Sequence, residues 1–199
     1  IAPVHVNHDM RVKIGGPLCK QPYSAALLNI SAMSYGALSS NAVEALNLGA
    51  KKGGFYHNTG EGSCSPYHLK QGGDIVWQVG TGYFGCRELD GKFSAEKFAA
   101  TAVHPNIKMI EIKLSQGAKP GHGGILPASK VTFEIAKMRG VEMGKDVMSP
   151  PWHTAFSTPM EMMKFIKLLR DLSGGKPVGF KLCVGKRREF IALCLAMRE

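Results

Sequence analysis

Short apolar runs alternate with amphipathic stretches along most of the chain, and this alternation predicts the architecture. The clearest apolar run lies at 107–114, where five large apolar residues give the composition of a buried strand: Ile107, Met109, Ile110, Ile112 and Leu114. Shorter runs predict further strands at 27–33, 55–58, 74–79 and 178–184. A second short run at 83–86 follows Gly80-Thr81-Gly82 and predicts either a hairpin with 74–79 or an excursion from the main repeat.

Helix start and stop signals fall between these runs. They predict helices at about 41–52, 94–103, 127–139, 158–173 and 189–199. The strongest start is Thr158-Pro159-Met160-Glu161, with threonine at the cap, proline first in the helix and glutamate at the third helical position. Asn41 and Glu44 also have the spacing of a capping box.

Two stretches lack a regular pattern. Residues 1–26 contain Pro3, Gly15-Gly16-Pro17 and Pro22, which predict an irregular lead-in. Residues 148–153 are too rich in proline for a regular element and predict an ordered loop.

The order of elements predicts an α/β fold with parallel strands and right-handed crossovers. We count four strand–helix units, whereas a complete TIM (β/α)8-type barrel takes about 250 residues. The 199 residues are therefore predicted to form a single domain, 1–199, that is either an open sheet or roughly the first half of such a barrel.

Composition narrows the class of protein. A hydrophobic content of 44% over 199 residues is enough to bury a substantial core. The five cysteines are widely spaced with no CxxC pair, which argues against a disulfide framework or a zinc site and favours a reducing compartment. His5 and His8 are the only closely spaced histidines, and no further ligand pattern accompanies them. We therefore expect no metal site.

The formal net charge of +10 raises the question of nucleic acid. Most lysines and arginines are scattered, however, and no nucleic-acid motif is present, so we expect no nucleic-acid partner. An anionic small ligand fits the charge equally well. No apolar run has transmembrane length and no signal-peptide pattern is present, which predicts a cytoplasmic protein. The sequence starts at Ile1 without methionine, so an upstream membrane segment would not be visible in it.

The chemistry is concentrated in the loop that follows the strand at 107–114. Residues 113–124 hold Lys113, Gln116, Lys119, His122 and four glycines. Glycine lets the backbone approach a ligand closely, and lysine binds carboxylate or phosphate. The alternative is a surface turn whose lysines face water.

Six motifs in order add a family resemblance. They are Ser31–Ser39 (SAMSYGALS), His57–Gly62 (HNTGEG), Gln78–Gly85 (QVGTGYFG), Ile112–Gly124 (IKLSQGAKPGHGG), Ser149-Pro150-Pro151 and Lys181-Leu182. Together they resemble the FMN-binding glutamate synthase family, through nearly the whole chain and over the N-terminal half of that family's domain.

The resemblance implies a TIM-type barrel with FMN at the carboxyl ends of its strands. It also implies an oxidoreductase that reduces 2-iminoglutarate, formed from 2-oxoglutarate and ammonia, to L-glutamate. The small-molecule partner would be a 2-oxoglutarate-like acid, and the electron donor is left open. The family's iron–sulfur cluster would belong to a part of the protein outside this sequence, since none of the five cysteines matches its spacing.

The resemblance also assigns residues to the cofactor. The expected cofactor-binding set is Met33, Ser34, Tyr35, Gly36, Thr59, Gln78, Gln116 and Lys181. Gln78 or Gln116 would hydrogen-bond the pyrimidine side of the flavin, and Lys181 or Lys113 would stabilise negative charge on it. Ser34 and Thr59 also suit simple capping or turn roles.

The substrate side of the site has its own set. Gln116, Lys119, Gly121 and His122 are expected to bind the substrate, and Lys113, Glu61 and Lys119 are the expected catalytic residues. Glu61 would bind the ammonia or imine side, or orient a lysine.

Two alternatives stay open. His122 stands where the large synthases have glutamate, so the chain can be a flavoenzyme for a different oxo or imino acid. Alternatively, it is a non-catalytic half-barrel that forms a homo-oligomer through its exposed sheet edge.

Overall fold

The centre of the fold is a parallel four-stranded sheet. A computed structural model describes residues 10–116, 119 and 121–199. The sheet has the order β3–β4–β5–β8, and all three pairings are parallel. Its strands are β3 (Tyr56–Asn58), β4 (Asp74–Val79), β5 (Ile107–Lys113) and β8 (Val178–Lys181). The α/β class with parallel strands is confirmed, and the described residues form no closed barrel.

The strand predicted at 27–33 is wrong in extent, because only Ile30 forms a bridge, with His57. Ile30 N–H donates to Tyr56 O and Asn58 N–H donates to Ile30 O, both at 3.0 Å. The exposed Leu27 and Leu28 have no core to pack against. The short pairing nevertheless runs parallel to β3 and delivers the segment that follows it to the carboxyl end of the sheet.

Helices alternate with the strands of the sheet. They are α1 (Ser40–Gly53), α2 (Pro66–Leu69), α3 (Ala95–Ala102), α5 (Pro159–Leu172) and α6 (Arg187–Ala196). The predicted caps Ser94 and Thr158 are confirmed, the second with a full capping box. The capping box at Asn41 is wrong, because the Ser39 side chain caps α1 and places Asn41 inside the helix. Helix α6 begins slightly before the predicted residue 189 and ends at Ala196.

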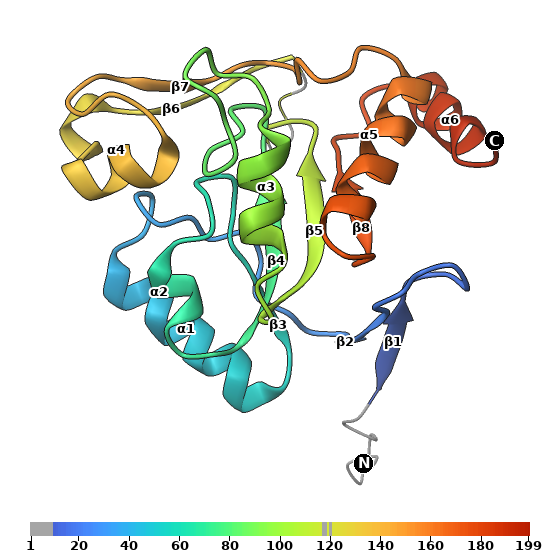
Figure 1. Cartoon of the computed structure of the whole chain (residues 1–199), viewed down its shortest axis with the longest axis horizontal. Coiled ribbons are helices and arrows are strands. Elements are labelled where there is room, and N and C mark those ends of the chain that lie inside the picture. The colour runs from blue at the N-terminus through green and yellow to red at the C-terminus, as the bar shows by residue number, and fades with distance from the viewer. Residues whose placement is uncertain (1–9, 117–118, 120) are drawn as a thin grey trace, which may run out of the picture.

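The two faces of the sheet bury different layers. Ile75, Trp77, Ile110 and Ile112 are at most 1% exposed and belong to the main core with α3 and α5. Trp77 stacks on Phe98 of α3 with ring centroids 5.1 Å apart. Figure 1 shows α3 in front of β4 and β5, with α5 beside them. Because side chains alternate along a strand, the other face of β4 and β5 carries a separate set of residues.

The lead-in is not irregular, which corrects the prediction for 1–26 over its described part. Strands β1 (Arg11–Ile14) and β2 (Tyr23–Ala26) pair antiparallel, and the glycine–proline breakers lie in the turn between them. Tyr23 and Ala25 pack with Val76 and Met109. The breakers therefore mark a hairpin connection rather than a lack of structure.

The hairpin predicted from 74–79 and 83–86 is wrong. β4 has parallel partners on both sides, β3 and β5, so neither of its edges is open to a returning strand. Residues 81–86 instead form a compact turn in which Tyr83 has φ +49° and is fully buried.

An excursion follows β5. Strands β6 (Gly124–Leu126) and β7 (Val147–Ser149) pair antiparallel and run along the carboxyl end of the sheet in Figure 1. The single helix predicted at 127–139 is split into a 3-10 turn, Ala128–Lys130, and α4 (Phe133–Arg139). Thr132 caps α4 and interrupts the helix. The loop predicted at 148–153 is wrong at its first two residues, because they complete β7. The strand predicted at 178–184 ends at Lys181.

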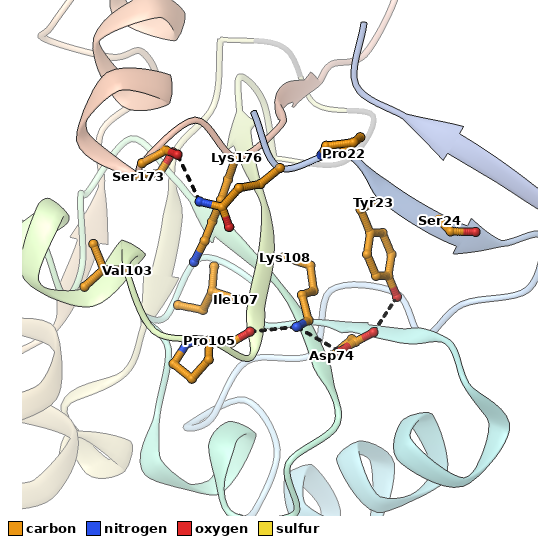
Figure 2. A pocket seen from close by; sticks show the side chains of 12 residues that line it. Pro22, Tyr23, Ser24, Asp74, Val103, Pro105, Ile107, Lys108, Ser173 and Lys176 are labelled. Atoms are coloured by element: carbon orange, nitrogen blue, oxygen red, sulfur yellow. Dashed lines mark hydrogen bonds and ion pairs between the residues drawn. The ribbon is translucent and has the colours of Figure 1, made fainter. Parts of the chain in front are cut away.

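A cavity of about 680 Å³ lies at the amino ends of the strands, away from the polar loops. Figure 2 shows Asp74 between the Tyr23 hydroxyl and the Lys108 ammonium. Lys176 is 5% exposed, and its ammonium donates to Ala102 O and His104 O at the end of α3. A cation at a helix carboxyl terminus stabilises it, so we assign Lys176 a structural role.

No helix of the described residues is long and apolar enough to cross a membrane.

Candidate active site

The carboxyl ends of the strands bring the polar loops together. Gln78, Glu111 and Lys113 alternate with Trp77, Ile110 and Ile112, so they lie on the sheet face that also carries Val76 and Met109. We call this face the inner face. In the register of the sheet, Gln78 lies beside Glu111, and Lys113 lies beside Lys181.

Three predicted site residues form one contact group, which we call the charge cluster: Glu61, Lys113 and Gln116. Lys113 Nζ lies 3.3 Å from Glu61 Oε1 and donates to Gln116 Oε1 at 2.7 Å. Gln116 Nε2 donates to Glu61 Oε2 at 2.7 Å. Each side chain contacts the other two, so the cluster fixes their orientations.

Glycine makes the room for this cluster. A β-carbon at Gly80 would lie 2.6 Å from Glu61 Oε2, and one at Gly124 would lie 3.3 Å from Gln116 Oε1. Gly80 follows β4 and Gly124 begins β6. Gly124 belongs to the loop whose glycines were predicted to let a ligand approach, and together with Gly80 it also lets Glu61 and Gln116 approach the backbone.

The charge balance of the cluster depends on Lys113. Its side chain is 13% exposed, and burial lowers the pKa of the ammonium below its ordinary value. The Glu61 carboxylate opposes this shift, whereas Lys181 and Lys119 reinforce it. Glu61 thus favours the protonated form of Lys113, whereas burial and the two neighbouring cations favour loss of the proton.

A second polar group lies further along the same strands, and we call it the amide cluster: Asn58, Gln78 and Glu111. Gln78 Nε2 donates to Glu111 Oε1 at 2.5 Å, and Asn58 Nδ2 donates to the same oxygen at 3.0 Å. Gln78 is 1% exposed, and its Oε1 is buried without a hydrogen-bond partner. A buried acceptor of this kind is free to take an N–H donor from a ligand.

A hydrogen bond from His68 fixes the turn at 33–36. Ser65 N–H donates to His68 Nδ1, which assigns the ring proton to Nε2, and Nε2 lies 2.9 Å from Met33 O. A β-carbon at Gly60 would meet Ser34 at 3.0 Å. The turn therefore packs against the loop that carries Glu61.

Tyr35 and Gly36 in this turn face α4. The Tyr35 hydroxyl donates to Glu134 Oε2 at 2.7 Å, and Gly36 has φ +104°. Thr59, by contrast, is fully buried: its hydroxyl donates to Gly60 O and accepts from Gln78 N–H. Its side-chain hydrogen bonds are internal, so its direct contribution to a ligand would come from the backbone.

Arg139 is a site residue that sequence reasoning did not select. It is 5% exposed, donates from Nη2 to Tyr35 O at 3.2 Å and lies over the Phe84 ring. A β-carbon at Gly62 would lie 2.7 Å from Nη2. Within the described part of the chain, no carboxylate lies within ion-pair distance of Arg139. This buried cation is suited to bind an anion.

His153 supports Lys113 from the backbone. Its Nε2 donates to Lys113 O at 2.9 Å, and its Nδ1 lies 3.1 Å from the Tyr83 hydroxyl. The ring stacks on Phe156 and is 4% exposed. These contacts give His153 a positioning role next to the charge cluster.

The rest of the predicted substrate set lies at the outer edge of the site. Lys119, Gly121 and His122 are exposed, and the Lys119 N–H donates to Gln116 O at 3.1 Å. Gly121 has φ +73° with open space around it. The structure thus places these residues at the rim, next to the charge cluster through Gln116.

A family profile described as "Conserved region in glutamate synthase" matches residues 11–199. The chain belongs to the glutamate synthase family.

Curated relatives support this membership. The glutamate synthase large subunit-like protein YerD of Bacillus subtilis strain 168 is 45% identical over 199 residues, covering 99% of this chain and 38% of its own length. The archaeal-type glutamate synthase [NADPH] of Thermotoga maritima is 33% identical over 181 residues, 90% of this chain and 33% of that protein. The archaeal glutamate synthase [NADPH] of Archaeoglobus fulgidus is 37% identical over 76% of this chain and 27% of its own. The chain spans well under half the length of these glutamate synthase relatives.

Sequence reasoning also missed Glu111 and His68 in this glutamate synthase family member. Alternation along the strand at 107–114 places Glu111 on the same face as Lys113, which was a usable signal. No such signal marks Arg139 or His68, because each reaches the site from a separate helix. Their contribution depends on tertiary packing.

No group of three metal-ligating side chains occurs among residues 10–116, 119 and 121–199. His5 and His8 lie outside the described residues.

Proposed function

We propose that the chain is the N-terminal part of an FMN-dependent, glutamate-synthase-like oxidoreductase. Its reaction is the reductive amination of 2-oxoglutarate, through 2-iminoglutarate, to L-glutamate. In this proposal the parallel sheet is the first half of a TIM-type barrel whose carboxyl-end face holds the site. Family membership supports the reaction class.

The observation that carries the proposal is the charge cluster. Glu61, from the loop after β3, meets Lys113 and Gln116, from the end of β5, in one contact group. A lysine held protonated in a mostly buried position stabilises negative charge that develops during a reaction. In this role the proton stays on Lys113 Nζ, and Glu61 keeps it there.

The cationic groups suit a dicarboxylate substrate. Lys119 at the rim, which bonds Gln116, and the buried Arg139, which lies against Gly62, are two separate positive groups near Glu61. We assign one carboxylate of 2-oxoglutarate to Lys119 with Gln116. We assign the other to Arg139, whose guanidinium matches a carboxylate in geometry.

The residues also fit a flavin. Gln78 Oε1 is a buried acceptor without a partner, as the pyrimidine ring N–H of FMN requires. The turn formed by Met33, Ser34, Tyr35 and Gly36 would lie along the ring edge, with Lys181 near its negative pole. When bound, FMN would supply the hydride for imine reduction.

The electron donor is proposed from the relatives. Two of them are named for NADPH, so NADPH is the first donor to test.

The test uses the full-length protein. We expect it to bind FMN, with the flavin absorbance bands appearing on titration, and to form L-glutamate from 2-oxoglutarate and ammonia. Glutamate is quantified by mass spectrometry, with other 2-oxo acids run in parallel. Absence of flavin binding after addition of FMN would refute the proposal.

A second candidate function is a flavoenzyme for a different oxo or imino acid. His122 is exposed at the rim, next to Gly121, where it can contact the distal end of a substrate. Indifference to 2-oxoglutarate together with turnover of another 2-oxo acid would favour this candidate.

A further inference from the structure

Glu111 explains why the side-chain oxygen of Gln78 is buried without a hydrogen-bond partner. The carboxylate accepts hydrogen bonds from both amides of the amide cluster through one oxygen, Oε1. A carboxylate accepts hydrogen bonds and cannot donate them. If the Gln78 carboxamide were rotated by half a turn, its Oε1 would face the Glu111 oxygen and repel it.

The orientation of Asn58 is fixed independently. Gly60 N–H donates to Asn58 Oδ1 at 3.0 Å, which leaves Nδ2 to donate to Glu111. Glu111 therefore has two fixed donors on one side, and the Gln78 amide nitrogen is one of them. The Gln78 oxygen is turned away from Glu111, is buried, and has no partner.

An unpaired buried acceptor destabilises a folded protein, so its retention calls for an explanation. We infer that Glu111 is a positioning residue that locks the Gln78 carboxamide with its oxygen toward the ligand, so that the site selects a ligand with an N–H donor at that point. The inference rests on the proposed function, in which that donor is the ring N–H at position 3 of the flavin.

The selection follows from the fixed orientation. A glutamine whose amide can rotate pairs with either a hydrogen-bond donor or a hydrogen-bond acceptor of a ligand. Gln78 is prevented from this rotation by the carboxylate. A flavin without the N–H leaves the Gln78 oxygen buried and unpaired.

The experiment compares FMN with 3-methyl-FMN, in which a methyl group replaces the N–H at position 3. Dissociation constants are measured on the full-length protein by flavin fluorescence and require no turnover. We expect FMN to bind at least about tenfold more tightly than 3-methyl-FMN. Glu111→Met removes the oxygen that accepts from both amides, so the Gln78 amide is free to rotate and we expect this preference to shrink to about twofold or less. Glu96→Met, at an exposed position on α3, is the matched control and keeps the preference.

Each outcome is decisive. Equal binding of the two flavins by the unchanged protein would overturn the inference and leave the proposed function standing, and this arm needs no folded variant. A preference that survives in Glu111→Met would also overturn it. A protein that binds neither flavin would refute the proposed function and the inference together.

Discussion

Glu61 is the residue on which the geometry of the site depends most directly. It contacts both Lys113 and Gln116, and it offsets the effect of burial on the lysine. Loss of its charge leaves a partly buried ammonium with two cationic neighbours. A substitution of Glu61 is therefore expected to act mainly through the lost charge and less through the lost contacts.

Glu61→Gln is expected to move the alkaline limit of turnover to lower pH. Without the carboxylate, burial and the neighbouring Lys181 and Lys119 lower the pKa of Lys113 further, so the ammonium is lost at a lower pH. The measurement is the kcat of glutamate formation by the full-length protein as a function of pH for both proteins. Superimposable pH profiles would contradict this role for Glu61.

Gly80→Ala tests the space that Glu61 occupies. The new β-carbon would lie 2.6 Å from Glu61 Oε2 and 2.7 Å from its Cβ, so Glu61 must leave its position. We expect 2-oxoglutarate affinity to fall at least about tenfold. Gly49→Ala is the control: it lies in α1 with no atom near its added carbon. It should leave affinity unchanged and stabilise the protein by about 1 kcal/mol.

At the scale of elements, sequence patterns predicted most strands and helices but not their partners. β5 has a strong apolar pattern, α5 has apolar periodicity and a clear N-cap, and both elements are confirmed. The hairpin predicted after β4 failed because pairing with β3 and β5 is decided by tertiary contacts. Likewise, the breakers at 15–17 carry no information on whether flanking residues pair.

For the site as well, sequence patterns predicted some of the residues but not those that depend on tertiary contacts. The loop after β5 and the motif around Glu61 were predicted from residue types, and the structure brings Lys113, Glu61 and Gln116 together. Arg139 was not predicted, because a basic residue near a helix end is ordinarily solvated. Only the packing of α4 under the turn at Tyr35 buries it.

The junction of α3 and β8 gives a prediction at element scale. Lys176 has a pKa of about 8, below its ordinary 10.5, chiefly because of burial. Between these values the unfolded chain binds a proton that the folded chain lacks, so stability rises with pH. We expect the free energy of unfolding of the unchanged protein, relative to Lys176→Met, to increase from pH 7.5 to pH 9.5 in urea titrations. A constant difference would contradict the assignment.

At the scale of the whole molecule, the sheet presents an open edge at β8, which has no further strand partner among the described residues. Several apolar residues of α6 are also exposed: Phe190, Ile191 and Leu195. Self-association through this edge stays a prediction for the chain on its own.

Buried histidines predict loss of stability in acid. His57 and His68 each have a pKa of about 4, lowered from 6.5 chiefly by burial. As the pH falls from 6.5 to 4, the unfolded chain takes up protons that the folded chain excludes. Each histidine then removes about 1.4 kcal/mol per pH unit at most. His57→Phe, which removes two buried nitrogens without partners, is expected to reduce this slope, by at most about 1.4 kcal/mol per pH unit, in urea titrations at pH 4.5 to 6.5. An unchanged slope would contradict the prediction.

The most direct test of the central claim is one anaerobic turnover of the full-length protein. The protein is loaded with FMN, photoreduced in the absence of oxygen, and mixed with 2-oxoglutarate and ammonia while flavin absorbance is recorded. We predict reoxidation of the flavin with one L-glutamate formed per flavin, and no reoxidation with either reagent alone. A flavin that stays reduced with both reagents present, or a protein that takes up no FMN, would contradict the account.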